Sequence, residues 1–189
     1  NVAYYEYLAV TNRHVVVTSS NMITKNLLVY LGNSNKLIQA SVIDYSTKDD
    51  LALISFKSEI YIPAASFADT TNLKRGSFVV AIGTPYDIVF DGSATFGIIS
   101  YPLRYVEEEV FVLGGTSYET CAVAYIQHDA AINSGNSGGG LFNMEGKLLG
   151  INTMKIISSS SNVINQLFST HPELEKRIDP KRYDFFHHL

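Results

Sequence analysis

The sequence has 189 residues, of which 46% are hydrophobic and 17% charged, which suits one globular domain with a substantial core and excludes a disordered chain. The formal net charge of −4 provides no basic surface for nucleic acid, so no nucleic-acid partner is expected. The single cysteine, Cys121, excludes an intrachain disulfide, and we interpret it as a small apolar residue. Because the chain does not begin with Met, we expect a processed or truncated form.

Short apolar or alternating runs, separated by turn residues, predict an all-β protein. Such strands at regular spacing are typical of a sandwich or a pair of barrels. The predicted strands span 7–11, 27–31, 38–43 and 51–56 in a first group, and 77–82, 94–99, 109–113, 124–127, 140–142 and 148–152 in a second.

The polar stretch Pro63–Gly76 divides the two groups and is interpreted as the link between two barrels. We therefore expect a single domain over residues 1–189, with an N-terminal barrel over 1–66, a C-terminal barrel over 76–157 and a helical tail over 158–189.

Helix is expected only in that tail. Apolar residues at 163, 164, 167 and 168 have helical spacing and predict a helix over Asn162–Phe168. Pro172, followed by Glu173 and Glu175, predicts the first turn of a second short helix.

The strongest chemical motif is Asn133–Gly139, which reads Asn-Ser-Gly-Asn-Ser-Gly-Gly. A nucleophilic serine needs an exposed hydroxyl and nearby N–H groups to hold an oxyanion, and glycines allow the tight turn and the close approach of a substrate carbonyl. Ser137 is the candidate nucleophile. The candidate oxyanion hole is Gly135, Asn136 and Ser137, with the amides of Gly135 and Ser137 as donors.

Two further residues complete a candidate triad. His14 follows the strand Val10-Thr-Asn-Arg, and Asp50 opens the apolar strand Leu51–Phe56. Alone, His14 fits a surface or core histidine, and Asp50 fits a turn residue. Together with Ser137 they run in the order His, Asp, Ser, with the first two in one strand group and the serine in the other, as a site between two barrels requires.

Several segments resemble the HtrA (DegP-like) family of trypsin-like serine proteases. They cover roughly residues 7–153 in the family's order, namely Val10–Val16, Asp50–Ile54, Phe78–Pro85, Ala94–Ser100, Ile126–Gly139 and Gly146–Thr153. The resemblance implies a double β-barrel and ATP-independent cleavage of unfolded or damaged proteins. It also implies an extracytoplasmic location and the triad His14, Asp50 and Ser137.

The sequence departs from the family pattern in several places. We expect the family's strand ahead of the histidine strand to be missing or truncated, and we expect no PDZ domain to follow. The segment after Thr153 moves almost directly to Ser158–Asn162, and Ser134 and Gly140 stand where the family often has proline. The segment Tyr101–Cys121 is a candidate activation loop, with an ordinary surface loop or a hairpin as open alternatives.

Ala131 stands six residues before Ser137, where trypsin-like enzymes place the base of the primary specificity pocket. An uncharged alanine there predicts cleavage after small or medium apolar residues. Asn136 carries no charge to pair with a newly cut N-terminus, so activation by clipping is not expected. Substrate binding is assigned to Ala131, Asn133, Ile151, Asn152 and Thr153.

We therefore expect a serine endopeptidase that works through an acyl-enzyme and needs no cofactor and no metal. The expected partners are unfolded polypeptide substrates, with room for a homotrimer and for a membrane anchor outside this chain. Two alternatives stay open. One is a resting or inactive peptide-binding protein of the same fold, and the other is an esterase, because Gly135–Gly139 also matches Gly-x-Ser-x-Gly.

Overall fold

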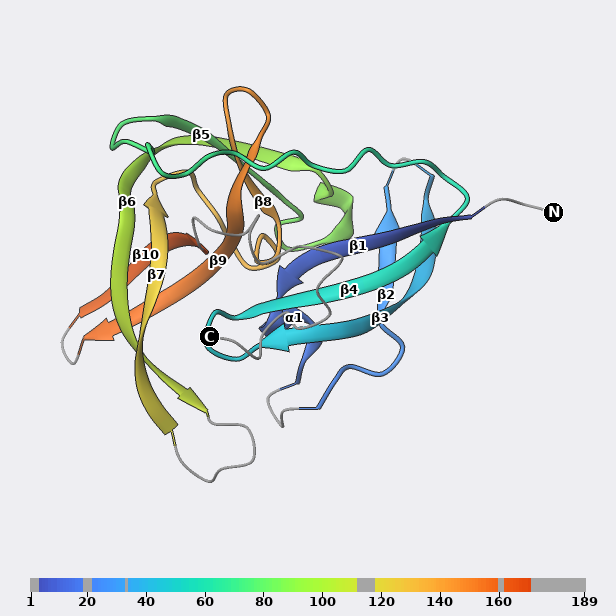
Figure 1. Cartoon of the computed structure of the whole chain (residues 1–189), viewed down its shortest axis with the longest axis horizontal. Helices are drawn as coiled ribbons and strands as arrows, with labels where there is room; N and C mark the ends of the chain where they lie inside the picture. Colours follow the sequence, from blue (N-terminus) through green and yellow to red (C-terminus); the bar gives the residue numbers. More distant parts are fainter. Residues whose placement is uncertain (1–3, 19–21, 33, 112–117, 160–161, 171–189) are drawn as a thin grey trace.

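The computed structural model describes residues 4–18, 22–32, 34–111, 118–159 and 162–170. The described chain is built almost entirely of antiparallel strands, which form a four-stranded curled sheet beside a closed barrel (Figure 1). This arrangement confirms the predicted all-β class and the trypsin-like pair of barrels.

The N-terminal sheet has the strand order β1-β4-β3-β2. Strand β4 lies inside the sheet and pairs with β1 on one side and β3 on the other. Most of its side chains are apolar and buried, which explains its nearly continuous apolar sequence. The strands are β1 (Tyr5–Asn12), β2 (Leu28–Leu31), β3 (Lys36–Ser46) and β4 (Leu51–Ser58).

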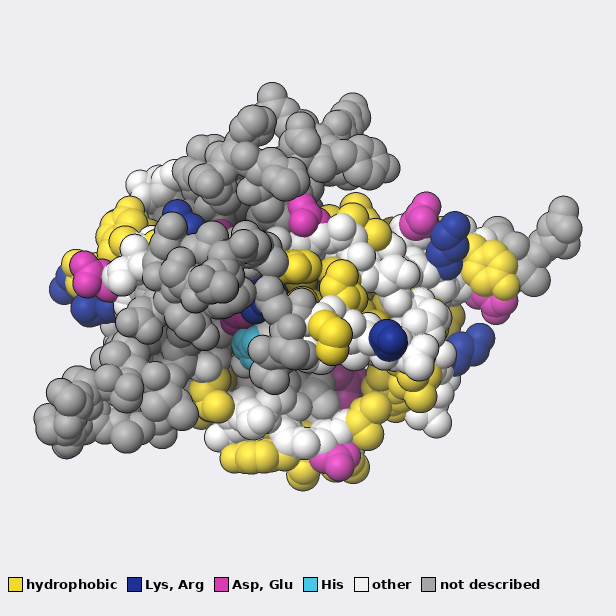
Figure 2. Space-filling view, turned by 90° about the horizontal axis from the view of Figure 1, so that it is seen from below, with side chains coloured by type: hydrophobic (Ala, Val, Ile, Leu, Met, Phe, Trp, Pro, Cys, Tyr) yellow, Lys and Arg dark blue, Asp and Glu magenta, His cyan; other side chains and the backbone are white. Residues whose placement is uncertain are grey.

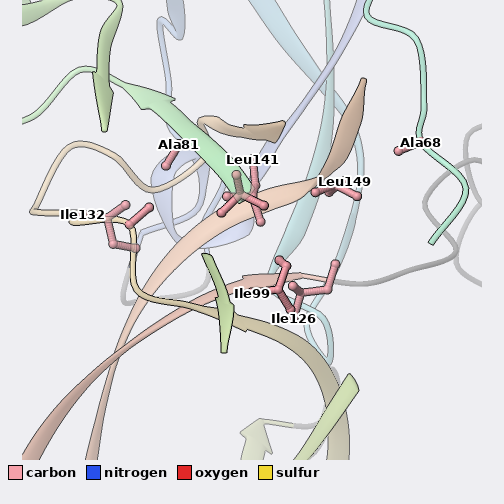
Figure 3. Packing of buried hydrophobic residues seen from close by; sticks show 9 residues of the cluster. Ala68, Ala81, Ile99, Ile126, Ile132, Leu141 and Leu149 are labelled. Carbon is pink, nitrogen blue, oxygen red and sulfur yellow. The ribbon is translucent and has the colours of Figure 1, made fainter. Parts of the chain in front are cut away.

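The C-terminal barrel closes in the order β10-β7-β6-β5-β8-β9. Inward-facing aliphatic side chains from most of these strands fill it, together with apolar residues of the link and of the β7–β8 loop, and Figure 3 labels seven members of this core cluster. The strands are β5 (Phe78–Gly83), β6 (Ser93–Phe111), β7 (Tyr118–His128), β8 (Gly140–Asn143), β9 (Leu148–Ser159) and β10 (Asn162–Thr170).

The helix predicted over Asn162–Phe168 is wrong. These residues form most of strand β10, which pairs with β9 along its whole length and with β7 at its C-terminal end. Two ladders of backbone hydrogen bonds close the barrel here, and their contribution outweighs the helical spacing of the apolar residues. Val163 and Ile164 are also β-branched, which favours a strand. The second expected helix lies outside the described residues.

Within the candidate activation loop Tyr101–Cys121, the described residues 101–111 and 118–121 belong to two long paired strands. The pairing of β6 with β7 runs out to Phe111 and Tyr118, so the predicted strand 94–99 and the described part of the predicted strand 109–113 are one strand. The hairpin alternative therefore holds for the described part of this segment. Two register shifts, before and after Tyr101, bend β6 where the hairpin leaves the barrel (Figure 1).

Two short helices were not predicted from the sequence. The first, α1 (Arg13–Val16), follows β1 directly, and the second is the 3₁₀ turn η1 (Ile88–Phe90), whose N-cap Asp87 accepts a hydrogen bond from the Val89 amide. Each is too short for a hydrophobic periodicity to be recognised. In the described parts of the chain, no helix has the length and hydropathy needed to cross a membrane.

The link between sheet and barrel packs on the barrel. The Ala68 amide donates to the Leu148 carbonyl (2.9 Å), and the Leu148 amide donates to the Ser66 carbonyl (2.8 Å). Ala68 is buried in the barrel core, and Leu73 packs against it. The apolar residues of the link thus hold it in a defined place between the two halves.

Candidate active site

His14 lies in α1, at the point where β1 ends. The Arg13 amide donates to the Asp50 carbonyl (2.9 Å), and the Val17 amide donates to the Arg13 carbonyl (2.9 Å), which closes the turn. Val16 is 1% exposed and anchors the turn in the core of the sheet. The His14 side chain is therefore held on the surface by a buried neighbour, and it remains 47% exposed.

Asp50 lies at the turn into β4, directly beside His14. Its Oδ2 is 2.6 Å from His14 Nδ1, and its Oδ1 accepts the His14 amide at 3.0 Å. A carboxylate only accepts hydrogen bonds, so Nδ1 donates to Asp50, and in the neutral imidazole Nε2 is then the acceptor. Asp50 adopts φ +54°, a left-handed conformation that Asp tolerates better than most residues.

Asn12 fixes the backbone of Asp50. The Asn12 side chain is fully buried, and its Nδ2 donates to the Asp50 carbonyl at 3.0 Å. The sequence analysis did not select this residue. Its only signal in the sequence is a polar amide at the end of an otherwise apolar strand, two positions before the candidate histidine.

The barrel also contacts Asp50. Thr153 on β9 donates its hydroxyl to Asp50 Oδ2 at 3.4 Å, a long hydrogen bond that joins the two halves of the molecule. Leu51, Leu148 and Ile151 form a buried cluster beside this contact. The carboxylate therefore lies at the junction of sheet and barrel, where the sequence order predicted the site.

Ser137 lies in the loop between β7 and β8, which backbone hydrogen bonds hold against β9. The Gly138 amide donates to the Asn152 carbonyl (2.9 Å), and the Asn152 amide donates to the Gly139 carbonyl (2.7 Å). The Ser137 side chain is half-buried, and its Oγ accepts the Met154 amide at 3.4 Å. The residues that follow the serine are thus fixed to the strand that also carries Thr153.

Two glycines of this loop have conformations that other residues rarely adopt. Gly135 has φ +97°, and a Cβ there would meet the Thr84 carbonyl oxygen. Gly138 has φ +88°, and a Cβ there would meet the Thr11 hydroxyl of β1. The motif therefore needs glycine at both positions for close approach, on one side to the β5–η1 segment and on the other to the sheet.

The amides of the nucleophile loop differ in their hydrogen bonds. The Asn136 amide donates to the Asn133 carbonyl at 3.0 Å. The amides of Gly135 and Ser137, by contrast, donate to no acceptor within the described residues. Of the three residues predicted for the oxyanion hole, these two have N–H groups available to a substrate oxygen.

The His14 ring and Ser137 make no direct hydrogen bond in the part of the chain that the structure describes. Hydrogen bonds of catalytic groups are often long before substrate binds, so this geometry does not exclude either residue. A proton transfer between them needs Nε2 and Oγ to come within hydrogen-bonding distance when a substrate is present.

The residues predicted to bind substrate differ in exposure. Ala131 and Asn133 are exposed, and the Ala131 carbonyl accepts the Thr95 hydroxyl at 2.7 Å. Ile151, Asn152 and Thr153 are buried at 3%, 0% and 1% exposure. Only the first two side chains can reach a substrate without rearrangement. Within the described residues, no group of three His, Cys, Asp or Glu side chains is placed to hold a metal ion.

A family model described as the trypsin-like peptidase domain matches residues 2–151. The chain belongs to the trypsin-like peptidase family. The match includes His14, Asp50 and Ser137 and ends just before Asn152 and Thr153. It agrees with the observed N-terminal sheet and C-terminal barrel.

Curated relatives confirm the resemblance to HtrA proteins. The chain is 39% identical to "Serine protease Do-like HtrA" of Lactococcus lactis subsp. lactis over 150 residues, which are 79% of this chain and 34% of the relative. It is 36% identical to "Serine protease HTRA1" of Xenopus tropicalis over 157 residues (83% and 31%). It is 38% identical to "Probable periplasmic serine endoprotease DegP-like" of Buchnera aphidicola over 155 residues (82% and 29%). The chain spans about a third of the length of these relatives.

Proposed function

We propose that this chain is a serine endopeptidase domain with Ser137 as nucleophile, His14 as general base and Asp50 as the residue that orients His14. The observation that carries the proposal is the 2.6 Å contact between Asp50 Oδ2 and His14 Nδ1, which orients the ring so that Nε2 of the neutral imidazole is the proton acceptor. Thr153 links the same carboxylate to the strand that holds the Ser137 loop. The names of the relatives support the same activity.

The proposed mechanism is acyl transfer. His14 Nε2 takes the hydroxyl proton of Ser137 as Oγ attacks the peptide carbonyl carbon. The Gly135 and Ser137 amides receive the oxyanion, and each such donor contributes roughly 10²–10³ in rate. The imidazolium then protonates the leaving amine, and water hydrolyses the acyl-enzyme with His14 again acting as base.

We further propose that the enzyme cleaves after small or medium apolar residues. Ala131 is exposed and carries no charge, and its neighbours Ala130 and Ile132 are buried at 0% and 5% exposure. The change Ala131→Asp should therefore shift cleavage towards substrates with Lys or Arg before the scissile bond. Profiling both proteins with a peptide library tests this, and an unchanged preference would remove Ala131 from the pocket.

Substrates, location and assembly follow from the relatives as proposals. We propose unfolded polypeptides as substrates and an extracytoplasmic location, the latter supported by the word periplasmic in the name of one relative. A homotrimer stays a prediction, and the candidate contact surface between copies is the outer face of β5 and β6, where Phe78 and Phe96 are 56% and 59% exposed with ring centroids 5.3 Å apart. A membrane anchor outside this chain stays a prediction.

The surface offers other apolar groups as well. Figure 2 shows hydrophobic side chains gathered over the N-terminal sheet, with Lys, Arg, Asp and Glu dispersed between them. Sedimentation equilibrium of the wild type and of Phe78→Ser measures whether the β5–β6 face carries self-association. We expect only the wild type to form a larger assembly. Equal molecular masses for the wild type and Phe78→Ser would exclude this face as a contact between copies.

A resting, peptide-binding protein is the second candidate. It is favoured by one observation, since Ser137 Oγ accepts the Met154 amide and makes no hydrogen bond to His14 in the described structure. In such a state the fold would hold extended peptides by strand addition without cleaving them.

The decisive experiment is intact mass after reaction with a fluorophosphonate, which labels only an activated serine. The wild type should gain one adduct, whereas Ser137→Ala and His14→Ala should gain none while keeping the wild-type circular dichroism spectrum. An adduct on Ser137→Ala would overturn the assignment of the nucleophile. An unlabelled but folded wild type would favour the resting state, and peptide binding measured by fluorescence anisotropy would then be the next test.

A further inference from the structure

The segment after β7 carries Ala131, the residue proposed for the base of the primary specificity pocket. The ladder of backbone hydrogen bonds between β6 and β7 ends where His128 pairs with Ile99. Residues 129–133 belong to no strand, although their side chains alternate between exposed and buried as in an extended chain. Contacts other than a regular ladder must therefore hold Ala131 in place.

Both ends of this segment are fixed by the barrel or by the loop that follows. At the start, the Asp129 amide donates to the Ile98 carbonyl (3.2 Å), and the Ile98 amide donates to Asp129 Oδ1 (2.6 Å). At the end, Ile132 belongs to the barrel core (Figure 3), and the Asn133 carbonyl accepts the Asn136 amide at 3.0 Å. These contacts leave only the middle of the segment to be held.

Ala131, in the middle, makes a single hydrogen bond within the described residues. Its carbonyl accepts the Thr95 hydroxyl of β6 at 2.7 Å, a typical length for a well-formed hydrogen bond between two oxygens. The preceding residue also lies close to β6, since a Cβ on Gly97 would meet the Ala130 amide nitrogen. Gly97 thus allows the close approach, and the Thr95 hydroxyl fixes the orientation of the next peptide group.

The hydrogen bond from Thr95 has two consequences for a pocket built on Ala131. It fixes the peptide group of Ala131, and with it the position of the exposed methyl group relative to Ser137. It also gives a partner to a carbonyl that would otherwise attract water. Water beside Ala131 would compete with an apolar substrate side chain, whereas a polar side chain could bond to that water.

We propose that Thr95 is a positioning residue for the primary specificity pocket, because its hydroxyl holds the Ala131 carbonyl and keeps the pocket selective for apolar side chains. The proposal rests on the proposed peptidase function and on the place of Ala131 in the pocket. Thr95 acts through Ala131, so the chemistry of His14 and Ser137 should not depend on it. The effect of losing the hydroxyl should therefore depend on the substrate side chain.

Two peptide substrates that differ only in valine or threonine before the scissile bond test this role, since these side chains have nearly the same shape and different polarity. Thr95→Val removes the hydroxyl and keeps the shape of the side chain. It should raise KM for the valine peptide about fivefold with kcat changed less than twofold, the effect of losing one hydrogen bond used in binding. The preference for the valine peptide in kcat/KM should narrow by a similar factor. Thr95→Ser keeps the donor and should restore the wild-type preference.

Thr71→Val is the matched control. The Thr71 hydroxyl also donates over 2.7 Å, to Asp69 Oδ1 in the link, so the same group is removed away from the pocket. This variant should keep the wild-type KM and preference. Fluorophosphonate carries no substrate side chain, and it should label Thr95→Val within twofold of the wild-type rate. Slower labelling, an equal loss of kcat for both peptides, or an unchanged preference would overturn the proposal.

Peptide binding tests the same role without catalysis. In a Ser137→Ala background, fluorescence anisotropy compares peptides that end in valine or in threonine with a free carboxylate. We expect tighter binding of the valine peptide, and adding Thr95→Val should reduce this difference about fivefold. Equal affinities in the background, or a difference that Thr95→Val leaves unchanged, would overturn the positioning role. A wild type that is neither labelled nor active, with a binding difference that still depends on Thr95, would refute the peptidase function and leave the positioning role intact.

Discussion

The two halves of the molecule hold their functional groups in different ways. The N-terminal sheet is small and open, and its buried clusters include residues such as Leu31 and Phe56 that retain 9% and 8% exposure. The barrel is closed, and five of the nine members of its core cluster are fully buried. A closed barrel leaves no unpaired edge, so its core is more fully excluded from water than that of an open sheet.

This difference matches the groups that each half supplies. The sheet holds His14 and Asp50 at its surface through contacts made by the Asp50 side chain and carbonyl. The barrel holds Ser137 through backbone bonds of its glycines to Asn152, in the buried first half of β9. We infer that the site is most sensitive to side-chain chemistry on the sheet and to core packing in the barrel.

The largest expected effect tests the sheet. Asp50→Asn should lower kcat by about 10⁴-fold, because an amide can present its NH₂ to His14 Nδ1 and stabilise the wrong tautomer. Stability should change little, since Asn also tolerates the left-handed backbone at this position. Steady-state hydrolysis of a peptide substrate and thermal unfolding measure both quantities.

Asp49→Asn is the matched control for this change. Asp49 is the adjacent residue, is buried and accepts a hydrogen bond from the Ser46 hydroxyl at 2.9 Å. It should keep kcat within about threefold, since it does not contact His14 in any described hydrogen bond. Equal losses for the two variants would assign the effect to the fold of the turn and would remove Asp50 from the mechanism.

The next effect compares the two cores. Leu141→Ala in the barrel should cost about 4–5 kcal/mol in the free energy of unfolding, at the upper end for such changes, because Leu141 is 0% exposed within the largest cluster. Ile54→Ala in the sheet should cost about 2–3 kcal/mol, since it is 7% exposed in a smaller cluster. Urea denaturation measures both, and equal costs would break the contrast drawn between sheet and barrel.

The pH dependence of stability probes the barrel alone. The unfolded chain binds a proton on His128 near pH 6.5, but burial delays this in the folded state to about pH 4. Between these values the unfolded state binds more protons, so the free energy of unfolding falls as the pH falls, by up to about 3 kcal/mol. Chemical denaturation from pH 7 to pH 4 should show this loss in the wild type.

His128→Leu removes the titrating group and is the control for that measurement. As the pH falls from 6.5 to 4, the free energy of unfolding of the wild type should fall relative to that of His128→Leu. A difference that stays constant with pH would show that His128 titrates alike in both states. Its ring would then be accessible to water in the folded protein.

The smallest expected effect concerns the hydrogen bond that joins the halves. Thr153→Val removes the hydroxyl that reaches Asp50 Oδ2 over 3.4 Å, and such a long bond should be worth less than about 1 kcal/mol. We expect kcat/KM to fall about twofold to fivefold, while Thr153→Ser keeps wild-type activity. A loss of more than tenfold in the valine variant would mean that the sheet and barrel are coupled more strongly than this distance indicates.

Some features of the site could be predicted from the sequence because they depend on short segments. The glycines around Ser137 and the apolar strand after Asp50 have the composition that their local conformations need. The contribution of Asn12 could not be predicted, because its bond to the Asp50 carbonyl spans 38 residues. The position of Thr153 beside Asp50, 103 residues away, also depends on how the barrel packs against the sheet.

The strand periods and the turn residues were determined by the sequence itself, because each reflects the local preferences of a few neighbouring residues. The order of His14, Asp50 and Ser137 is also a property of the sequence alone. Only the tertiary structure decided that 162–168 is a strand and that Tyr101–Cys121 is largely paired. In both places the unpaired edges of neighbouring strands gain hydrogen bonds that no local pattern reveals. The same holds for the burial of His128, which is 2% exposed, because a histidine at the end of a strand does not reveal which elements pack over it.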